Sequence, residues 1–206
     1  MLLAVNPNRM ELLRLKRRLA LAKRGYKLLK DKRDALIQKF IKIVQENLKT
    51  REEFDKKMRE NINLFLVSTL AMTNNEQNAI FQFPQRDIKV KVIHQNIMSV
   101  NVPHYEMTDE GNPYPYGFIQ TSPELDIAIK KYKDLIPLML KMAELDKAVL
   151  LLTEEIEKTR RRVNALEYVM IPNLEDTIKF ITMKLDEMAR SSSSALMRIK
   201  EIIRGE

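Results

Sequence analysis

Hydrophobic residues recur at every third or fourth position through the first part of the chain. From Leu12 to Phe40 the steps between them alternate strictly between three and four, which is the heptad pattern of coiled-coil helices. The positions are Leu12, Leu15, Leu19, Ala22, Tyr26, Leu29, Arg33, Leu36 and Phe40, of which only Arg33 is charged. Asn8 is suited to cap the first turn, and no proline occurs between Pro7 and Pro84. The pattern predicts one long helix over residues 9–82.

The strict spacing fails at Asn47. Beyond Phe40 an approximate stripe continues through extra four-residue steps, as in the stutters of coiled coils. Its positions are Val44, Leu48, Arg51, Asp55, Met58, Ile62 and Phe65. We expect this stripe to keep the helix paired beyond the strict heptads.

A matching stripe runs through the last part of the chain, after the helix-start signal Thr121-Ser122-Pro123-Glu124. Its positions are Leu138, Met142, Leu145, Val149, Leu152, Ile156, Thr159, Val163, Leu166, Met170, Leu174, Ile178, Ile181, Leu185 and Met188. We expect Pro137 and Pro172 to bend this helix without ending it, because the stripe resumes beyond both. The sequence predicts a second long helix over residues 124–204, fraying at the serine run 191–194.

A different pattern occupies the connector, residues 83–123. Apolar residues alternate with polar ones in two short runs, which is the period of a strand with one buried face. The apolar members are Ile88, Val90, Val92, Met98, Val100 and Val102. We predict a β-hairpin at about residues 87–103 with its turn at residues 94–96, followed by a turn-rich loop at residues 109–117.

The lengths of these segments decide how the helices pair. Each helix would be on the order of 110 Å long at 1.5 Å per residue. A parallel pairing would require the connector to span that distance almost fully stretched, at roughly 3.3 Å per residue, with no hairpin possible. We therefore predict a mainly α fold, a long antiparallel two-helix coiled coil with a small central β-hairpin lobe.

Composition narrows the class of protein. Hydrophobic residues make up 45% and charged residues 31% of the chain, which excludes a disordered protein and a membrane-spanning one. There is no cysteine, so thiolate metal sites and thiol nucleophiles are excluded. Residues 1–5 are too short for a signal peptide, and we expect a soluble intracellular chain.

The positive charge is concentrated in one segment. Thirteen Lys and Arg face only three acidic residues between Arg9 and Lys42, an excess larger than the net charge of +8 for the whole chain. Such a strip attracts an acidic partner: nucleic acid, an anionic membrane or an acidic protein surface. Leu13, Ala20, Leu28, Ile37 and Ile41 widen the apolar face of the same helix, which indicates a further partner along it.

We expect no catalytic, cofactor-binding or metal-binding site. The sequence has no glycine-rich phosphate loop, no HExxH and no GxSxG. A metal site at His94 or His104 would need Glu106 or Asp109 as a further ligand, and nothing in the sequence fixes that geometry. Glu154 and Glu157 are spaced to form ion pairs with Lys158 and Arg161 on an exposed helix face rather than a carboxylate pair for catalysis.

Several segments closely resemble the D subunit of the V-type rotary ATPases. The first signature is Asn6-Pro7-Asn8-Arg9-Met10-Glu11-Leu12, with Leu15-Lys16 and Arg24-Gly25-Tyr26-Lys27-Leu28-Leu29-Lys30-Asp31-Lys32. The second is Glu155-Ile156-Glu157-Lys158-Thr159-Arg160-Arg161-Arg162-Val163-Asn164-Ala165-Leu166-Glu167-Tyr168, with Ile171-Pro172 and Leu174. Residues 96–100 and Tyr116-Gly117 fit the middle region of the family. Asn8 and Tyr26 depart from its usual Thr and His, and the tail after Arg190 has no clear counterpart.

The resemblance implies a non-catalytic rotor shaft inside a hexamer of A and B subunits, where ATP hydrolysis or synthesis is coupled to proton or sodium movement through a membrane ring. It also implies contacts with the F subunit and with the C (or d) subunit, which caps the ring. Neither nucleic acid nor membrane insertion is implied. Such a shaft belongs to the peripheral V1/A1 sector, on the cytoplasmic side of the membrane.

Two interfaces follow as hypotheses. The residues expected to face the bore of the hexamer are Arg14, Arg17, Arg18, Arg24, Lys27, Arg160, Arg161 and Arg162. The residues expected to face the F subunit are Ile88, Val90, Val92, Met98 and Val100.

Two other functions would also explain a basic coiled coil. A nucleic-acid-binding coiled coil is one, although its basic block would precede the heptads, whereas here basic residues interleave with them from Leu12 onward. A self-associating scaffold protein is the other, and it predicts a stable homodimer.

Overall fold

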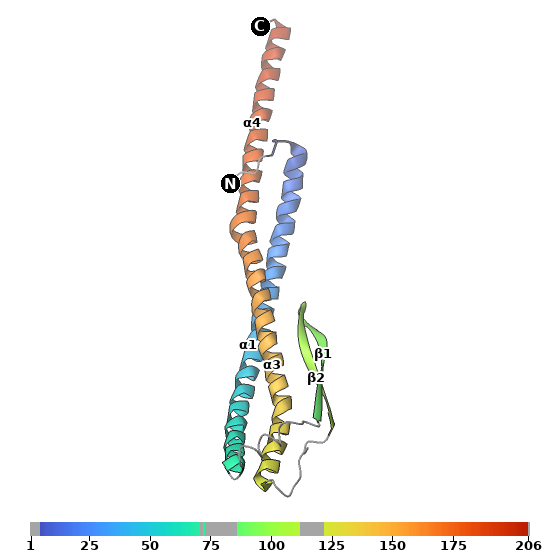
Figure 1. The fold of residues 1–206 in the computed structure, drawn as a ribbon. Helices are drawn as coiled ribbons and strands as arrows, with labels where there is room; N and C mark the ends of the chain where they lie inside the picture. The colour runs from blue at the N-terminus through green and yellow to red at the C-terminus, as the bar shows by residue number, and fades with distance from the viewer. Residues whose placement is uncertain (1–4, 71, 73–85, 112–121, 206) are drawn as a thin grey trace. The chain divides into compact units, whose positions relative to one another are not determined.

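The computed structural model describes residues 5–70, 72, 86–111 and 122–205. Helix α1 spans Arg9–Leu70, α3 spans Pro123–Asn164 and α4 spans Ile171–Arg204, with a π-helical segment η1, Ala165–Met170, between the last two (Figure 1). Strands β1, Arg86–Ile97, and β2, Val100–Gly111, form an antiparallel hairpin. The mainly α fold with paired long helices and a small hairpin is confirmed.

The chain divides into two compact units, residues 1–35 with 156–206, and residues 36–155. Each of the helices α1 and α3 is divided between the two units, with one part in the first unit and the other part in the second. The first helix is shorter than the predicted range 9–82, because α1 ends at Leu70 and Met72 forms a bend. Residues 73–82 of the prediction lie outside the described residues.

The first unit is held together by one hydrophobic cluster that joins α1 to the C-terminal helix. Leu15 and Ala22 of α1 pack with Leu174 and Ile181 of α4, and all four are buried. The residues packed around them are Val5, Leu12, Leu19, Leu166, Ile171, Ile178 and Leu185. Lys23 of α1 forms an ion pair with Glu175 at 2.7 Å across the same pairing. Residues near the two ends of the chain therefore lie side by side, in the predicted antiparallel sense.

The predicted signals for helix starts are confirmed at both helices. The Asn8 carboxamide oxygen accepts a hydrogen bond from the Met10 amide at 3.4 Å. The Ser122 hydroxyl accepts one from the Glu124 amide at 3.3 Å. Each cap satisfies an amide that the first turn of a helix leaves unpaired.

The buried seam of α1 repeats every seven residues and then shifts once. Leu15, Ala22, Leu36, Ile43 and Thr50 are buried, and the next buried residues are Asn61 and Ser68. The seam makes an eleven-residue step after Thr50, whereas the stutter was predicted between Phe40 and Leu48, so its predicted position is wrong. The predicted stripe is also wrong in phase, because Leu48, Arg51, Asp55 and Ile62 are exposed. Polar residues occupy the seam instead. The Thr50 hydroxyl donates to the Glu46 carbonyl at 2.9 Å and Asn47 donates to Asp146 at 2.6 Å, so burial leaves these donors satisfied.

The stripe of the C-terminal helix is confirmed at its central positions and wrong at Met170 and Met188, which are exposed. In η1 the Ile171 amide donates to the Leu166 carbonyl, five residues back, so this turn contains one residue more than an α-turn. Ile171 therefore takes the seam position expected of Met170.

The C-terminal helices continue through both prolines, as expected, and also through the serine run. Pro137 lies inside an α3 that continues to Asn164, and Pro172 follows η1 in the first turn of α4. The predicted fraying at residues 191–194 is wrong, because α4 runs on to Arg204 and ends at Gly205, which has a φ of 73°. The Ser192 hydroxyl donates to the Met188 carbonyl at 2.8 Å, so the serine is accommodated within the helix.

The hairpin is longer than predicted, and its turn lies elsewhere. Its pairing runs from Arg86 with Gly111 to Ile97 with Val100. The turn predicted at residues 94–96 is wrong, because these residues lie in β1. The loop predicted at residues 109–117 is wrong at residues 109–111, which lie in β2. Residues 112–117 of that loop lie outside the described residues.

The two-residue turn is formed by Met98 and Ser99, with φ of 52° and 73°. Positive φ at both central residues matches the right-handed twist of the strands, although neither residue type favours it. The Asn96 side chain stabilises the turn by accepting a hydrogen bond from the Ser99 amide at 3.0 Å and donating one to Asn101 at 3.1 Å.

Candidate partner-binding surfaces

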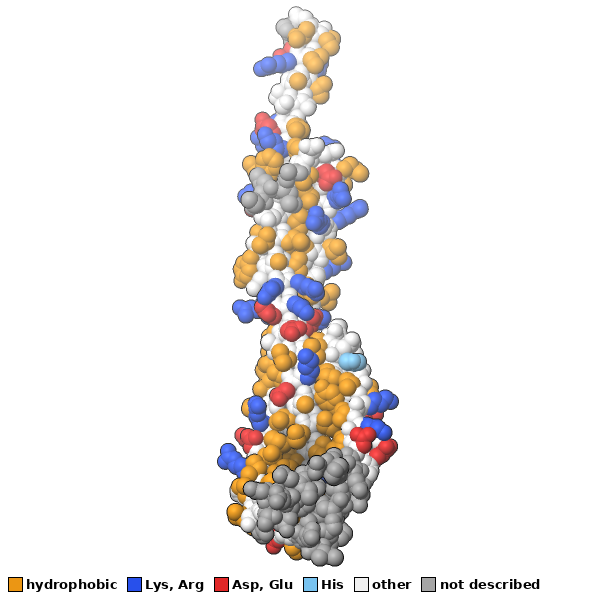
Figure 2. Space-filling model, viewed as in Figure 1, with side chains coloured by type: hydrophobic (Ala, Val, Ile, Leu, Met, Phe, Trp, Pro, Cys, Tyr) orange, Lys and Arg blue, Asp and Glu red, His pale blue; other side chains and the backbone are white. Residues whose placement is uncertain are grey.

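The predicted basic residues of α1 all lie at the surface of the first unit. These are Arg14, Arg17, Arg18, Arg24 and Lys27, and none of them is buried. Arg14 forms an ion pair with Glu11 at 3.4 Å along the same helix. Leu15 and Ala22 of the same segment join the hydrophobic cluster with α4, while the solvent side of the segment carries these basic residues together with exposed leucines. Figure 2 shows basic side chains interleaved with hydrophobic ones over the upper part of the molecule.

The triple arginine forms a separate basic surface. Arg160, Arg161 and Arg162 are exposed in the last turns of α3, while Thr159 and Val163 on either side are buried. Arg161 forms an ion pair with Glu157 one turn earlier, as predicted. The two basic groups lie on different helices, α1 and α3, within the first unit.

The sequence prediction missed an apolar patch beside the triple arginine. Tyr168, Val169 and Met170 are exposed on η1, and Tyr168 is exposed by 72%. π-Helical turns occur frequently at functional sites. The available signal was the five-residue step from Leu166 to Ile171, just before Pro172, which interrupts the spacing of three and four.

The apolar residues of α1 predicted to lie off the heptad seam are at the surface. Leu13, Ala20, Leu28, Ile37 and Ile41 are all exposed, as expected for a surface that does not serve the helix pair. The structure adds Leu21, which is exposed by 71% and was not singled out from the sequence.

The hairpin is attached to the second unit through β2. Residues 87–96 of β1 are exposed, whereas Val100 and Val102 of β2 are buried. His104 Nδ1 lies 2.8 Å from a Glu144 carboxylate oxygen, and Asp109 forms an ion pair with Lys133 at 3.3 Å, both on α3.

Among the residues expected to face the F subunit, Ile88, Val90, Val92 and Met98 lie at the surface of the hairpin. Val100 is buried, so it is not available on that surface. The exposed apolar surface of the hairpin is therefore mainly a property of β1.

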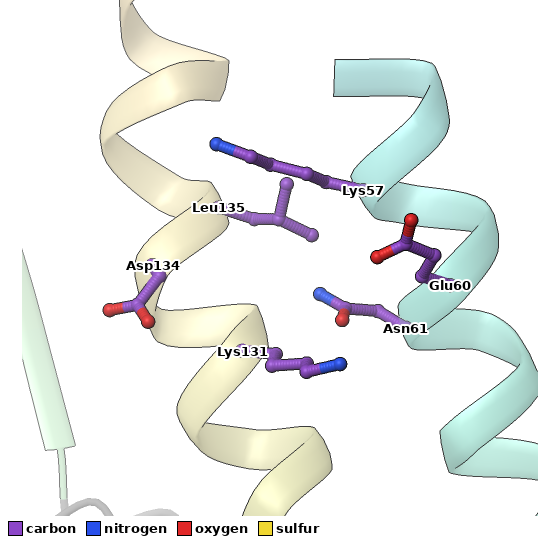
Figure 3. A pocket seen from close by; sticks show the side chains of 6 residues that line it. All are labelled: Lys57, Glu60, Asn61, Lys131, Asp134 and Leu135. Carbon is purple, nitrogen blue, oxygen red and sulfur yellow. The ribbon is translucent and has the colours of Figure 1, made fainter. Parts of the chain in front are cut away.

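A cavity of about 250 Å³ lies between α1 and α3 in the second unit (Figure 3). It is lined by Lys57, Glu60, Asn61, Lys131, Asp134 and Leu135. The amide of the buried Asn61 points across the gap toward α3 (Figure 3). Lys57 also pairs with Glu53 at 2.5 Å, and this ammonium lowers the pKa of the Glu53 carboxyl. The lining has two basic and two acidic side chains, so the cavity does not favour an ion of either sign.

Two of the ligands considered for a metal site contact residues of α3 instead. His104 lies against Glu144 and Asp109 against Lys133, while His94 is exposed on β1. Within the described part of the chain, no group of three or more His, Cys, Asp and Glu residues is arranged to hold a metal ion. Among the described helices, none is long and apolar enough to cross a bilayer.

Comparisons with known proteins agree on one family. The model of the family described as the D subunit of ATP synthase matches residues 11–201. A V-type ATP synthase D subunit of Thermoanaerobacter sp. (strain X514) is 52% identical over 201 residues, covering 97% of this chain and 96% of that protein. A protein of the same name from Clostridium botulinum (strain ATCC 19397 / Type A) is 48% identical over 208 residues, covering 98% and 96%.

Proposed function

The chain belongs to the family of ATP synthase D subunits, and on that premise we propose that it is the central rotor shaft of a V-type ATPase. In this role it couples ATP hydrolysis or synthesis in a hexamer of A and B subunits to ion movement through a membrane ring. The F subunit and the ring-capping C (or d) subunit complete the rotor. The sector of the complex that contains the shaft is peripheral and lies on the cytoplasmic side of the membrane.

The observation that carries the proposal is the packing of the two chain ends against each other. Leu15 and Leu185 belong to one hydrophobic cluster, although 170 positions separate them in the sequence. The pairing directs the apolar seam inward and leaves the outer faces of both helices to contact a surrounding ring. A rotor shaft requires this arrangement, because its contacts must be made outward while its two helices turn together.

The paired helices also differ in charge, which supports a role as an asymmetric shaft. Residues 9–35 of α1 carry eleven basic and three acidic side chains, whereas residues 171–190 of α4 carry three basic and four acidic ones. A surrounding subunit therefore meets a strongly basic face or a nearly neutral one, depending on the angle of the shaft. Because of this difference, the energy of contact between the shaft and a given ring subunit depends on the rotation angle of the shaft. This dependence couples the state of the ring to the angle of the shaft.

The chemistry of ATP is assigned to the interfaces between the A and B subunits, and this chain contributes only mechanical contacts. When an interface changes state, it favours one orientation of the basic face over the others. During synthesis the same coupling acts in reverse, because an interaction energy between two sites is reciprocal.

Reconstitution of the chain with a purified hexamer of A and B subunits tests the proposal. We expect one chain per hexamer and ATP-driven rotation, in one direction, of a bead attached through an introduced cysteine. The chain has no native cysteine, so the attachment point is unique. A chain that fails to bind the hexamer, or binds without rotating, contradicts the proposal.

Neutralising the triple arginine should weaken this coupling. Replacing Arg160, Arg161 and Arg162 together by Gln removes three exposed charges, each worth roughly 0.2–1 kcal/mol in a contact. We expect the rotation torque or coupled ATPase rate to fall about two- to tenfold. The matched control is Arg51→Gln with Lys56→Gln and Arg59→Gln, which are exposed in the second unit. Unchanged rotation of the first variant in single-molecule assays would refute the assigned contact.

The exposed apolar residues of β1 are proposed to bind the F subunit. The variant Ile88→Ser with Val90→Ser and Val92→Ser keeps the strand but removes its aliphatic surface. We expect the affinity for the purified F subunit to fall by more than about tenfold, because partial burial of three aliphatic side chains contributes that much.

A matched variant serves as the control for the hairpin. Leu196, Ile199 and Ile202 on α4 are at least as exposed as the three β1 residues, and their replacement by Ser should leave the affinity for the F subunit unchanged. Isothermal titration of each variant provides the measurement. Full affinity in the β1 variant, or in a chain from which the hairpin is deleted, counts against this interface.

A further inference from the structure

Helix α1 carries a second stripe in which apolar residues and arginines alternate. Its positions recur at steps of three or four residues, so they share one face of the helix. They are Met10, Leu13, Arg17, Leu21, Arg24 and Leu28. We call this set the outer stripe.

The outer stripe is not part of the packing between helices. The hydrophobic cluster uses Leu15 and Ala22 of α1, and each residue of the outer stripe is exposed. Leu13, Leu21 and Leu28 expose 55%, 71% and 70% of their surfaces. Apolar residues repeated on one exposed face, rather than scattered singly, are typical of a surface that binds a partner.

The arginines between the leucines identify the kind of partner. In the described residues neither Arg17 nor Arg24 has an ion pair, although the surrounding segment has a large excess of positive charge. A partner complementary to this stripe offers carboxylates to the guanidinium groups and aliphatic surface to the leucines. Nucleic acid offers phosphates, but its backbone provides no aliphatic groove for three leucines.

We infer that the outer stripe is one binding surface for a protein groove with an aliphatic floor and a carboxylate rim. The leucines hold the complex together by burying apolar surface, and the arginines steer the encounter. This inference rests on the proposed function, because it places the groove in the bore of the hexamer.

Binding kinetics of the full chain on the purified hexamer of A and B subunits separate the two contributions. The leucine variant is Leu13→Ser with Leu21→Ser and Leu28→Ser, and the arginine variant is Arg17→Gln with Arg24→Gln. We expect the leucine variant to dissociate at least about tenfold faster with an unchanged salt dependence. The arginine variant should associate more slowly and lose part of the salt dependence.

A control variant keeps the same number of serine substitutions. Leu48, Leu66 and Val67 are exposed to a similar degree in the second unit, and their replacement by Ser should leave dissociation from the hexamer unchanged. Circular dichroism of all variants checks that α1 remains helical.

The outcomes distinguish this inference from the proposed function. If the wild-type chain binds the hexamer and the leucine variant dissociates at the wild-type rate, the inference is wrong while the proposed function stands. If the wild-type chain does not bind the hexamer, both are wrong. Binding of the chain to a DNA duplex instead, equally by the wild type and the leucine variant, would assign the stripe to nucleic acid and overturn the inference.

Discussion

Replacement of Ile181 by Asp should separate the N-terminal part of α1 from α4. Ile181 is completely buried in the cluster that joins Leu15, Ala22 and Leu174. The substitution removes the aliphatic contacts and places a carboxylate in a cluster of apolar side chains. Loss of a buried isoleucine costs about 2–5 kcal/mol, and the uncompensated charge adds to this, so we expect a destabilisation above about 4 kcal/mol.

Spin labels report the separation directly. Cysteines introduced at the exposed positions Arg18 and Lys184 are the only thiols of the chain, so each label is unambiguous. We expect the distance between the labels to lengthen and broaden in the Asp variant, with a lower urea midpoint for this unit. Met183→Asp is the control, because Met183 lies two residues away on the same helix and is exposed by 64%. Equal effects of the two substitutions would show that Ile181 does not hold the helices together.

The seam was predictable from the sequence along the strict heptads of both helices. Leu15, Leu36, Leu152 and Ile181 lie at heptad positions and are buried, because burial of apolar surface dominates the pairing of helices. The prediction failed from Ile43 onward, because the predicted stripe passed through Val44 instead and because polar residues occupy the seam at Thr50, Asn61 and Ser68. A hydrophobicity scale assigns polar side chains to the surface. It therefore cannot anticipate a threonine whose hydroxyl donates a hydrogen bond to a carbonyl of its own helix, or an asparagine that donates one to the partner helix.

The turn of the hairpin was mispredicted for a different reason. The alternation of residues correctly predicted two strands, but the turn was misplaced because Met98 and Ser99 are poor candidates for positive φ. The stabilising contact comes from the side chain of Asn96, which sequence propensities place in the turn itself. Its register was set by pairing along the whole hairpin, which is not visible in a short window of sequence.

The candidate surfaces were predictable to the extent that charge determines exposure. The arginines of α1 and α3 are at the surface, as expected for side chains that are rarely buried without partners. Leu21 and Tyr168 were missed, because an exposed apolar residue is recognised only when the buried face of its helix is known. Tyr168 further depends on a π-helical turn, which no ordinary helical period describes.

The π-helical turn η1 lies just before Pro172 and accommodates this proline in the helix. Pro172 has no amide hydrogen, and in a regular α-helix its ring would crowd the carbonyl of Tyr168. The turn at residues 165–170 accommodates this with one extra residue, which is why the seam steps from Leu166 to Ile171. Deleting Met170 while replacing Pro172 by Ala should therefore restore steps of four and three without moving Leu174 or Ile181 off the seam.

A deletion outside the π-helical turn should have a very different result. Removing Lys179 rotates the following residues by about 100° relative to the preceding ones, so either Leu174 or Ile181 must leave the seam. Because both are buried, we expect a loss of about 3–5 kcal/mol, against less than about 1 kcal/mol for the Met170 deletion with Pro172→Ala. Urea unfolding and amide exchange in residues 9–35 of α1 provide the comparison. Equal destabilisation by the two deletions would show that the extra residue in η1 is needed for packing, whereas the predicted difference would show that the protein keeps its seam in phase despite the proline.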